Sequence, residues 1–102
     1  MARFAEDQTI VVRAKALSSR LSELADEDSE AYGAFMAERT DETRARIIAV
    51  PREVASRAEE AAGLAEELRG RVRGAVVGDA DVAAELAQAA ARAARRLADL
   101  NE

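Results

Sequence analysis

The spacing of the apolar residues in the first third of the chain constrains its fold most strongly. Apolar side chains recur at steps of four and three, with one gap: Ile10, Ala14, Leu17, Leu21, Leu24, Ala31 and Phe35. This spacing collects them on one side of an α-helix, whereas a half-buried strand would alternate apolar and polar residues. Of 102 residues, 26 are alanine, five are glycine and one is proline, so few positions interrupt a helix. We therefore predict an all-α protein.

Three long helices account for the whole chain as a single domain, residues 1–102. They are predicted at about residues 5–39, 42–73 and 79–100. Thr40 or Asp41 is predicted to cap the second helix, and Asp79 the third. Pro51 falls inside the second helix, so we expect either a kink or two helices that meet there. The apolar link 74–78 is short enough to make its helices antiparallel neighbours, and the chain an up-and-down bundle.

The same spacing rule predicts which helix faces form the core. The second helix is expected to bury Ile47, Val54, Ala58, Ala61, Ala65, Leu68 and Val72. The third is expected to bury Val82, Leu86, Ala89, Ala93, Leu97 and Leu100. Three long helices with so few large apolar residues bury little area relative to the cost of ordering the chain. We therefore expect a two-fold homodimer, with the alanines beside the third stripe as candidate contacts: Ala83, Ala87, Ala90 and Ala94.

The composition excludes several classes of function. The chain has no Cys, no His and no Trp, which removes disulfides, zinc sites of the Cys or His type and Ser-His or Cys-His catalysis. A net charge of −5 and 3% aromatic residues make nucleic acid a poor partner. No apolar stretch approaches the roughly 20 residues of a membrane span, and Glu6 and Asp7 interrupt any secretory signal. We expect a cytoplasmic protein with no membrane and no nucleic-acid partner.

Asp28 is the most informative single residue, because it fills the gap in the first apolar stripe. A carboxylate on an apolar seam is costly unless water, a cation or a ligand reaches it. One interpretation places Asp28 at a wet end of the bundle or beside an arginine. The other makes it an acid or base in a cleft between helices. Tyr32 lies one turn further on and would share that helix surface with a ligand, although a lone tyrosine is usually a core or interface residue.

Arginines near the end of the second helix form a second candidate site. Arg69, Arg71 and Arg73 alternate there, and Arg73 is a candidate contact for a phosphate or carboxylate group of a ligand. Charge solvated at a helix end is the ordinary explanation. Without histidine, carboxylates alone make a weak metal cluster, so we predict no metal.

Three segments of the chain share their pattern with a known family. Residues 24–36, LADEDSEAYGAFM, are similar to L-A-D-E-D-A-E-A-[YF]. Residues 50–55, VPREVA, are similar to V-P-L-E-[IV]-A, and residues 79–87, DADVAAELA, to S-D-[AV]-x-V-A-A-x-L-A. In this order they resemble the cyclodeaminase/cyclohydrolase family, the type of the C-terminal domain of formimidoyltransferase-cyclodeaminase. The resemblance covers the middle of that domain, truncated at both ends.

The resemblance implies a function in folate one-carbon metabolism. It implies a helical bundle that dimerises and holds a tetrahydrofolate derivative, without a metal, in a cleft near the subunit interface. The activity would be that of a cyclodeaminase, an ammonia-lyase that cyclises 5-formimidoyltetrahydrofolate to the 5,10-methenyl form, or of a methenyltetrahydrofolate cyclohydrolase. Asp28 would transfer protons, and Asp79 would orient the ligand or cap its helix. The alternative is a non-catalytic helical module that assembles with itself or binds a partner helix.

Overall fold

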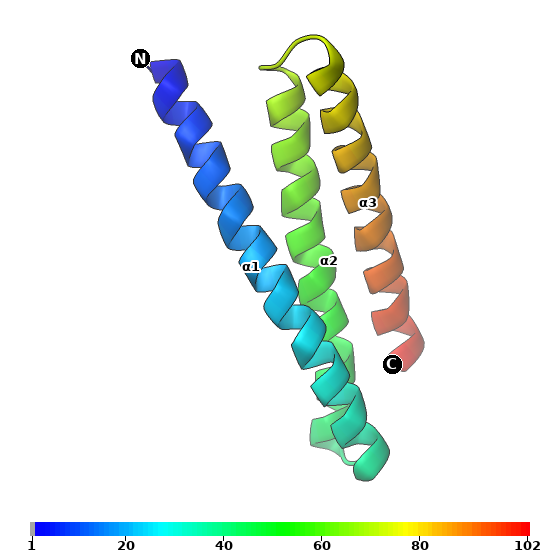
Figure 1. Ribbon diagram of the computed structural model, residues 1–102. Helices are drawn as coiled ribbons and strands as arrows, with labels where there is room; N and C mark the ends of the chain where they lie inside the picture. Colours follow the sequence, from blue (N-terminus) through cyan, green and yellow to red (C-terminus); the bar gives the residue numbers. More distant parts are fainter. Residues whose placement is uncertain (1) are drawn as a thin grey trace.

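The computed structural model describes residues 2–102, and their side chains from residue 8 onward. It contains three helices, α1 (Ala2–Ala37), α2 (Asp41–Arg69) and α3 (Ala75–Asn101), which run alternately down, up and down the molecule (Figure 1). No strand occurs in the described part of the chain. The prediction of an all-α, up-and-down bundle is therefore confirmed.

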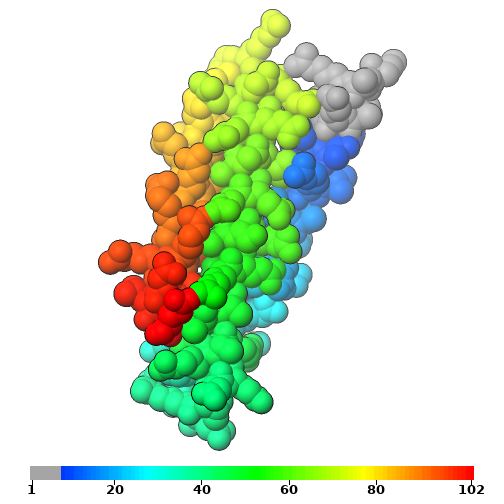
Figure 2. Space-filling model, turned by 180° about the vertical axis from the view of Figure 1, so that it is seen from behind, coloured from blue at the N-terminus to red at the C-terminus, as the bar shows by residue number. Residues whose placement is uncertain are grey.

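The three helices form an open layer instead of a closed triangle. The Cα atoms span 54 × 22 × 16 Å, and α2 lies between α1 and α3 in both overall views (Figures 1 and 2). Within the described residues, no Cα atom of α1 comes within 8 Å of one in α3. Both outer helices therefore depend on α2 for their packing.

The helix boundaries follow from local caps. Thr40 begins α2 with a capping box: its hydroxyl accepts from the Thr43 backbone N–H at 3.1 Å, and the Thr43 hydroxyl accepts from the Thr40 N–H at 2.9 Å. The prediction for Asp79 is wrong, because α3 already begins at Ala75 and Asp79 lies in its second turn. Gly74, with a φ of 67°, makes the reversal that lets the apolar link become the first turn of α3.

A single continuous helix, α2, runs through Pro51. A proline at this position has no N–H to donate to the carbonyl four residues earlier, which belongs to Ile47. The side chain of Asn101, at the end of α3, supplies the missing donor: its Nδ2 donates to the Ile47 carbonyl at 2.9 Å. The helix is thus not split at Pro51, and a kink there stays a prediction.

The contact between α2 and α3 is made of alanine. The buried residues of α3 are Ala80, Ala84, Ala91, Ala94 and Ala98, and those of α2 include Ala55, Ala58 and Ala62. Small side chains on both sides let the two backbones approach closely. The predicted core stripe of α3 is wrong, because all six of its residues are exposed. Ala94, predicted as a dimer contact, is instead buried in this alanine seam.

The contact between α1 and α2 combines apolar packing with one strong ion pair. Four residues of the predicted stripe are buried, seven positions apart: Ile10, Leu17, Leu24 and Ala31. Of the other three, Leu21 and Phe35 are half-buried and Ala14 is exposed. Beside them Arg20 of α1 holds both carboxylate oxygens of Glu53 on α2, each at 2.7 Å. This bidentate geometry lowers the pKa of the Glu53 carboxyl and raises that of the Arg20 guanidinium, since each hydrogen bond favours the charged forms.

Enlarging a seam alanine tests the close approach of α2 and α3. We expect Ala55→Leu to destabilise the fold by about 1–3 kcal/mol, because the added methyl groups have no space between the helices. Ala49→Leu, at an exposed position of the same helix, is the control and should be close to neutral. Chemical denaturation measures both, and equal effects would show that the seam tolerates larger side chains.

A double-mutant cycle tests the repair of the helix at Pro51. We expect Asn101→Ala to cost about 1–2 kcal/mol, because the Ile47 carbonyl then loses the donor that replaces the missing N–H of Pro51. In a Pro51→Ala background, α2 regains its own N–H at position 51, so the cost of Asn101→Ala should shrink. An unchanged cost in the two backgrounds would contradict the assignment of Asn101 as the replacement donor.

The Arg20–Glu53 pair predicts a pH dependence. Because the folded-state pKa of Glu53 lies below its ordinary value of 4.5, the pair stabilises the protein above that pH. Its contribution is lost as the pH falls from 4.5 through the lowered pKa. The free energy of unfolding should therefore decline less steeply with acid in Glu53→Gln than in the wild type. Glu38→Gln, an exposed control, should keep the wild-type slope.

Candidate functional site

Asp28 lies at the edge of a groove that all three helices line. The groove has a volume of about 230 Å³ and is lined by Leu21, Leu24, Ala25, Asp28, Pro51, Val54, Ala94 and Leu97. Asp28 is the only ionisable residue among them. The groove is therefore an apolar trough with one carboxylate at its rim.

The helix α1 positions Asp28 at this rim. Leu24 and Ala31, on either side in the sequence, are fully buried, which fixes the rotation of the helix. Asp28 itself is exposed and makes no ion pair with any residue whose side chain is described. Its carboxylate is thus exposed to water without an arginine beside it, and it borders a cleft between helices. A role as acid or base in that cleft stays a prediction.

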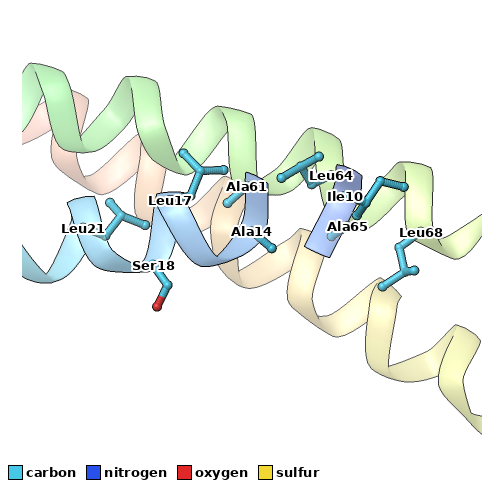
Figure 3. A pocket seen from close by; sticks show the side chains of 9 residues that line it. All are labelled: Ile10, Ala14, Leu17, Ser18, Leu21, Ala61, Leu64, Ala65 and Leu68. Atoms are coloured by element: carbon cyan, nitrogen blue, oxygen red, sulfur yellow. The ribbon is translucent and has the colours of Figure 1, made fainter. Parts of the chain in front are cut away.

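A second groove lies between α1 and α2 and adjoins the first at Leu21, which lines both. Its volume is about 380 Å³, and Figure 3 shows its apolar side chains between the two helices: Ile10, Ala14, Leu17, Leu21, Ala61, Leu64, Ala65 and Leu68. Ser18 supplies its one hydroxyl. Typical ligand pockets measure about 300–1,000 Å³, so the Asp28 groove alone is small and the two together are of ordinary size.

The other predicted site residues lie away from Asp28. Tyr32 is one turn further along α1 and is 59% exposed. With a rise of about 1.5 Å per residue, Asp79 lies about 22 Å along α3 from Ala94, which lines the Asp28 groove. Arg73 is exposed in the turn between α2 and α3, beyond the Leu68 end of the second groove. Within one chain, therefore, Asp28 and Asp79 cannot act on the same atom.

The strongest charged cluster was not predicted from the sequence. Arg20 contacts Glu27 at 3.2 Å and Glu23 at 3.2 Å in addition to Glu53, which also lies 3.5 Å from Arg57. These charges already satisfy one another, so the cluster fastens α1 to α2 and offers no free group for chemistry. Glu53 belongs to the segment 50–55 on which the family resemblance rests, and that was the available signal.

The described side chains contain no group of three or more acidic residues that could hold a metal ion. None of the described helices carries an apolar stretch long enough to cross a bilayer. In the groove lined by all three helices, Asp28 is the one ionisable residue in an otherwise apolar lining.

Comparison with known proteins bears on the identity of this groove. Neither the curated proteins nor the solved structures contain a match to the chain. The sequence model of one family, described as formiminotransferase-cyclodeaminase, matches residues 2–102. This match covers nearly the whole chain and includes the three segments noted above. The chain belongs to the formiminotransferase-cyclodeaminase family.

Proposed function

We propose that the chain binds a tetrahydrofolate derivative in the groove beside Asp28 and promotes its cyclodeaminase or cyclohydrolase chemistry. Membership of the family supports a folate as the ligand class. The observation that carries the proposal is the position of Asp28, a solvated carboxylate at the rim of an apolar trough. A flat heterocycle would bury its faces against the trough and leave its reacting nitrogens at the rim.

The cyclodeaminase reaction suits a lone carboxylate. The N10 nitrogen of 5-formimidoyltetrahydrofolate attacks the formimidoyl carbon, which forms the N10–C bond, and N10 gives up its proton. In the protonated substrate the former imine nitrogen already carries two hydrogens. It gains the proton that N10 loses, its bond to the carbon breaks, and it leaves as ammonia, while the cationic 5,10-methenyl product remains. Asp28 would accept the proton from N10 and return it to the leaving nitrogen. In the cyclohydrolase reaction the same carboxylate would take a proton from the water that attacks the methenyl carbon and give it to N5 as the bond between that carbon and N5 breaks; the second water proton is released as the 10-formyl group forms.

The two adjoining grooves suit an elongated ligand. From Leu21 the second groove leads along α2 to Leu68, five residues before Arg73 and about 21 Å along the helix from Val54. A folate whose ring system lies at Asp28 would direct its tail toward this end, and a tail of several glutamates would bring carboxylates to Arg73. Tyr32 would cover the exposed side of the ring one turn beyond Asp28. These two roles, the orienting role of Asp79 and a cytoplasmic location are part of the proposal.

The alternative function is a helical module that assembles without a ligand. The observation that favours it is the exposure of the large apolar residues of α3, a surface that suits another protein better than a folate. The two functions are compatible, because Leu97 is the one large apolar residue of that surface that also lines the groove beside Asp28.

Ligand-induced stabilisation tests the proposal. We expect 5-formyltetrahydrofolate to raise the midpoint of thermal unfolding, since a ligand present at 100 times its Kd stabilises the native state by about 2.7 kcal/mol. Asp28→Asn should keep this thermal shift. It should slow the formation of the methenyl product from 5-formimidoyltetrahydrofolate by roughly 10²–10⁴-fold, the usual contribution of a proton-transfer group.

The matched control is Asp26→Asn, which changes an exposed carboxylate of α1 that does not line the groove. It should retain both binding and turnover. No thermal shift at saturating ligand would refute folate binding. A shift without turnover in the wild type would refute the catalytic part alone and favour the assembly module.

A further inference from the structure

Residues 10–19 of α1 are held to α2 mainly by two side chains. Within this segment only Ile10 and Leu17 are buried, with 6% and 8% of their surface exposed. They form one cluster with Leu64 of α2, and Ala61 packs against that cluster. The two charged residues of the segment, at positions 13 and 15, form no ion pair or hydrogen bond with a residue whose side chain is described. The hold on this segment is therefore narrow and apolar.

Empty space flanks Leu17 on two sides. One side is the second groove, of about 380 Å³, and the other is a hollow of about 270 Å³. Leu17 is the one residue that lines both, and Figure 3 shows it between the two helices near Ala61. Protein interiors are normally close-packed, so a leucine with a hollow on either side gains fewer dispersion contacts than a leucine in a closed core.

The next part of α1 is fastened more firmly. Arg20 donates to both carboxylate oxygens of Glu53, each at 2.7 Å. Beyond this ion pair, Leu24 and Ala31 are 0% exposed. The backbones show the same difference, because α1 and α2 converge toward the turn that joins them and diverge toward the N-terminal end of α1 (Figure 1). The ion pair thus lies at the boundary between a firmly held and a weakly held part of α1.

We propose that residues 10–19 form a strap that detaches from α2 and closes again while the rest of the fold stays intact, with the Arg20–Glu53 pair as the boundary of the movement. Isolated helices shorter than about 12–15 residues are marginal in water, so a strap that has lost its packing also unravels. Local opening of this kind requires less free energy than global unfolding. The movement is a property of the free chain and does not depend on folate binding.

The strap is a movable wall of the second groove. Four of the five α1 residues that line this groove belong to it: Ile10, Ala14, Leu17 and Ser18. The opposite wall belongs to α2, which its alanine seam with α3 keeps in place. An open strap therefore exposes the α2 wall and admits a ligand from the side, and a closed strap covers it. This gating role rests on the proposed function, whereas the opening itself does not.

Native-state hydrogen exchange measures the opening along the chain. We expect the backbone amides of residues 14–19 to be at least about tenfold less protected than those of residues 24–31. Their exchange should also depend less on denaturant, because local opening exposes less surface than global unfolding. Equal protection and equal denaturant dependence of the two segments would overturn the proposal, since α1 would then open as one unit.

Variants outside the strap separate its opening from global unfolding. Leu24→Ala removes packing that persists when the strap opens, so it should speed exchange of residues 24–31 and leave that of residues 14–19 unchanged. Asn101→Ala, a milder change in the contact between α2 and α3, gives the same test if Leu24→Ala does not fold. Leu17→Ala, inside the strap, should speed exchange of residues 14–19. Faster strap exchange in Leu24→Ala or Asn101→Ala, by the same factor as in residues 24–31, would overturn the proposal.

The gating role is tested with 5-formyltetrahydrofolate. At 100 times its Kd, this ligand should slow exchange of residues 14–19 by about 100-fold, because it binds only when the strap is closed. A thermal shift without slower strap exchange would overturn the gating role. No thermal shift would refute folate binding and the gating role with it, whereas the variants alone decide whether the strap opens.

Discussion

The alanine seam between α2 and α3 is the constraint on which the rest of the structure depends. Two helices that meet through methyl groups approach closely and leave no space for leucine or valine between them. The large apolar residues of α3 must therefore lie elsewhere, and they lie in solvent. The small residues of α3 make its contact with α2, and its large apolar residues are exposed for this reason.

Pro51 links the packing of the helices to the candidate site. The proline deprives the Ile47 carbonyl of a partner, and Asn101 repairs the loss from the end of α3. This ties the last turn of α3 to the second turn of α2, next to the groove that Pro51 itself lines. The residues that line the groove thus come from helix segments fastened to each other: α1 to α2 by Arg20 and Glu53, and α3 to α2 by Asn101. These two contacts hold the helix segments around Asp28 in place relative to each other.

The sequence predicted helix identity and order because period and caps are local properties. The seven-residue spacing in α1 marked its buried residues, and Thr40 marked the start of α2. The sequence pattern predicted the wrong buried face of α3. A periodic pattern shows that apolar residues share one side of a helix, but not which neighbouring helix that side contacts. The large apolar side chains of Val82 and Leu86 led to their prediction as core residues, whereas the actual contact between α2 and α3 is made by small side chains. The Arg20–Glu53 pair joins positions 33 apart, and no local pattern predicts such a contact.

An open layer of three helices has a chemical consequence for Asp28. A carboxylate that must exchange protons benefits from water before the ligand arrives and from its exclusion afterwards. Asp28 is exposed to water at the rim of the groove, so its carboxylate is not desolvated in the free chain. A bound heterocycle would remove that water from the rim of the groove. Solvent exposure of Asp28 in the free chain is therefore consistent with the proposed role, since a carboxylate buried in advance would destabilise the fold.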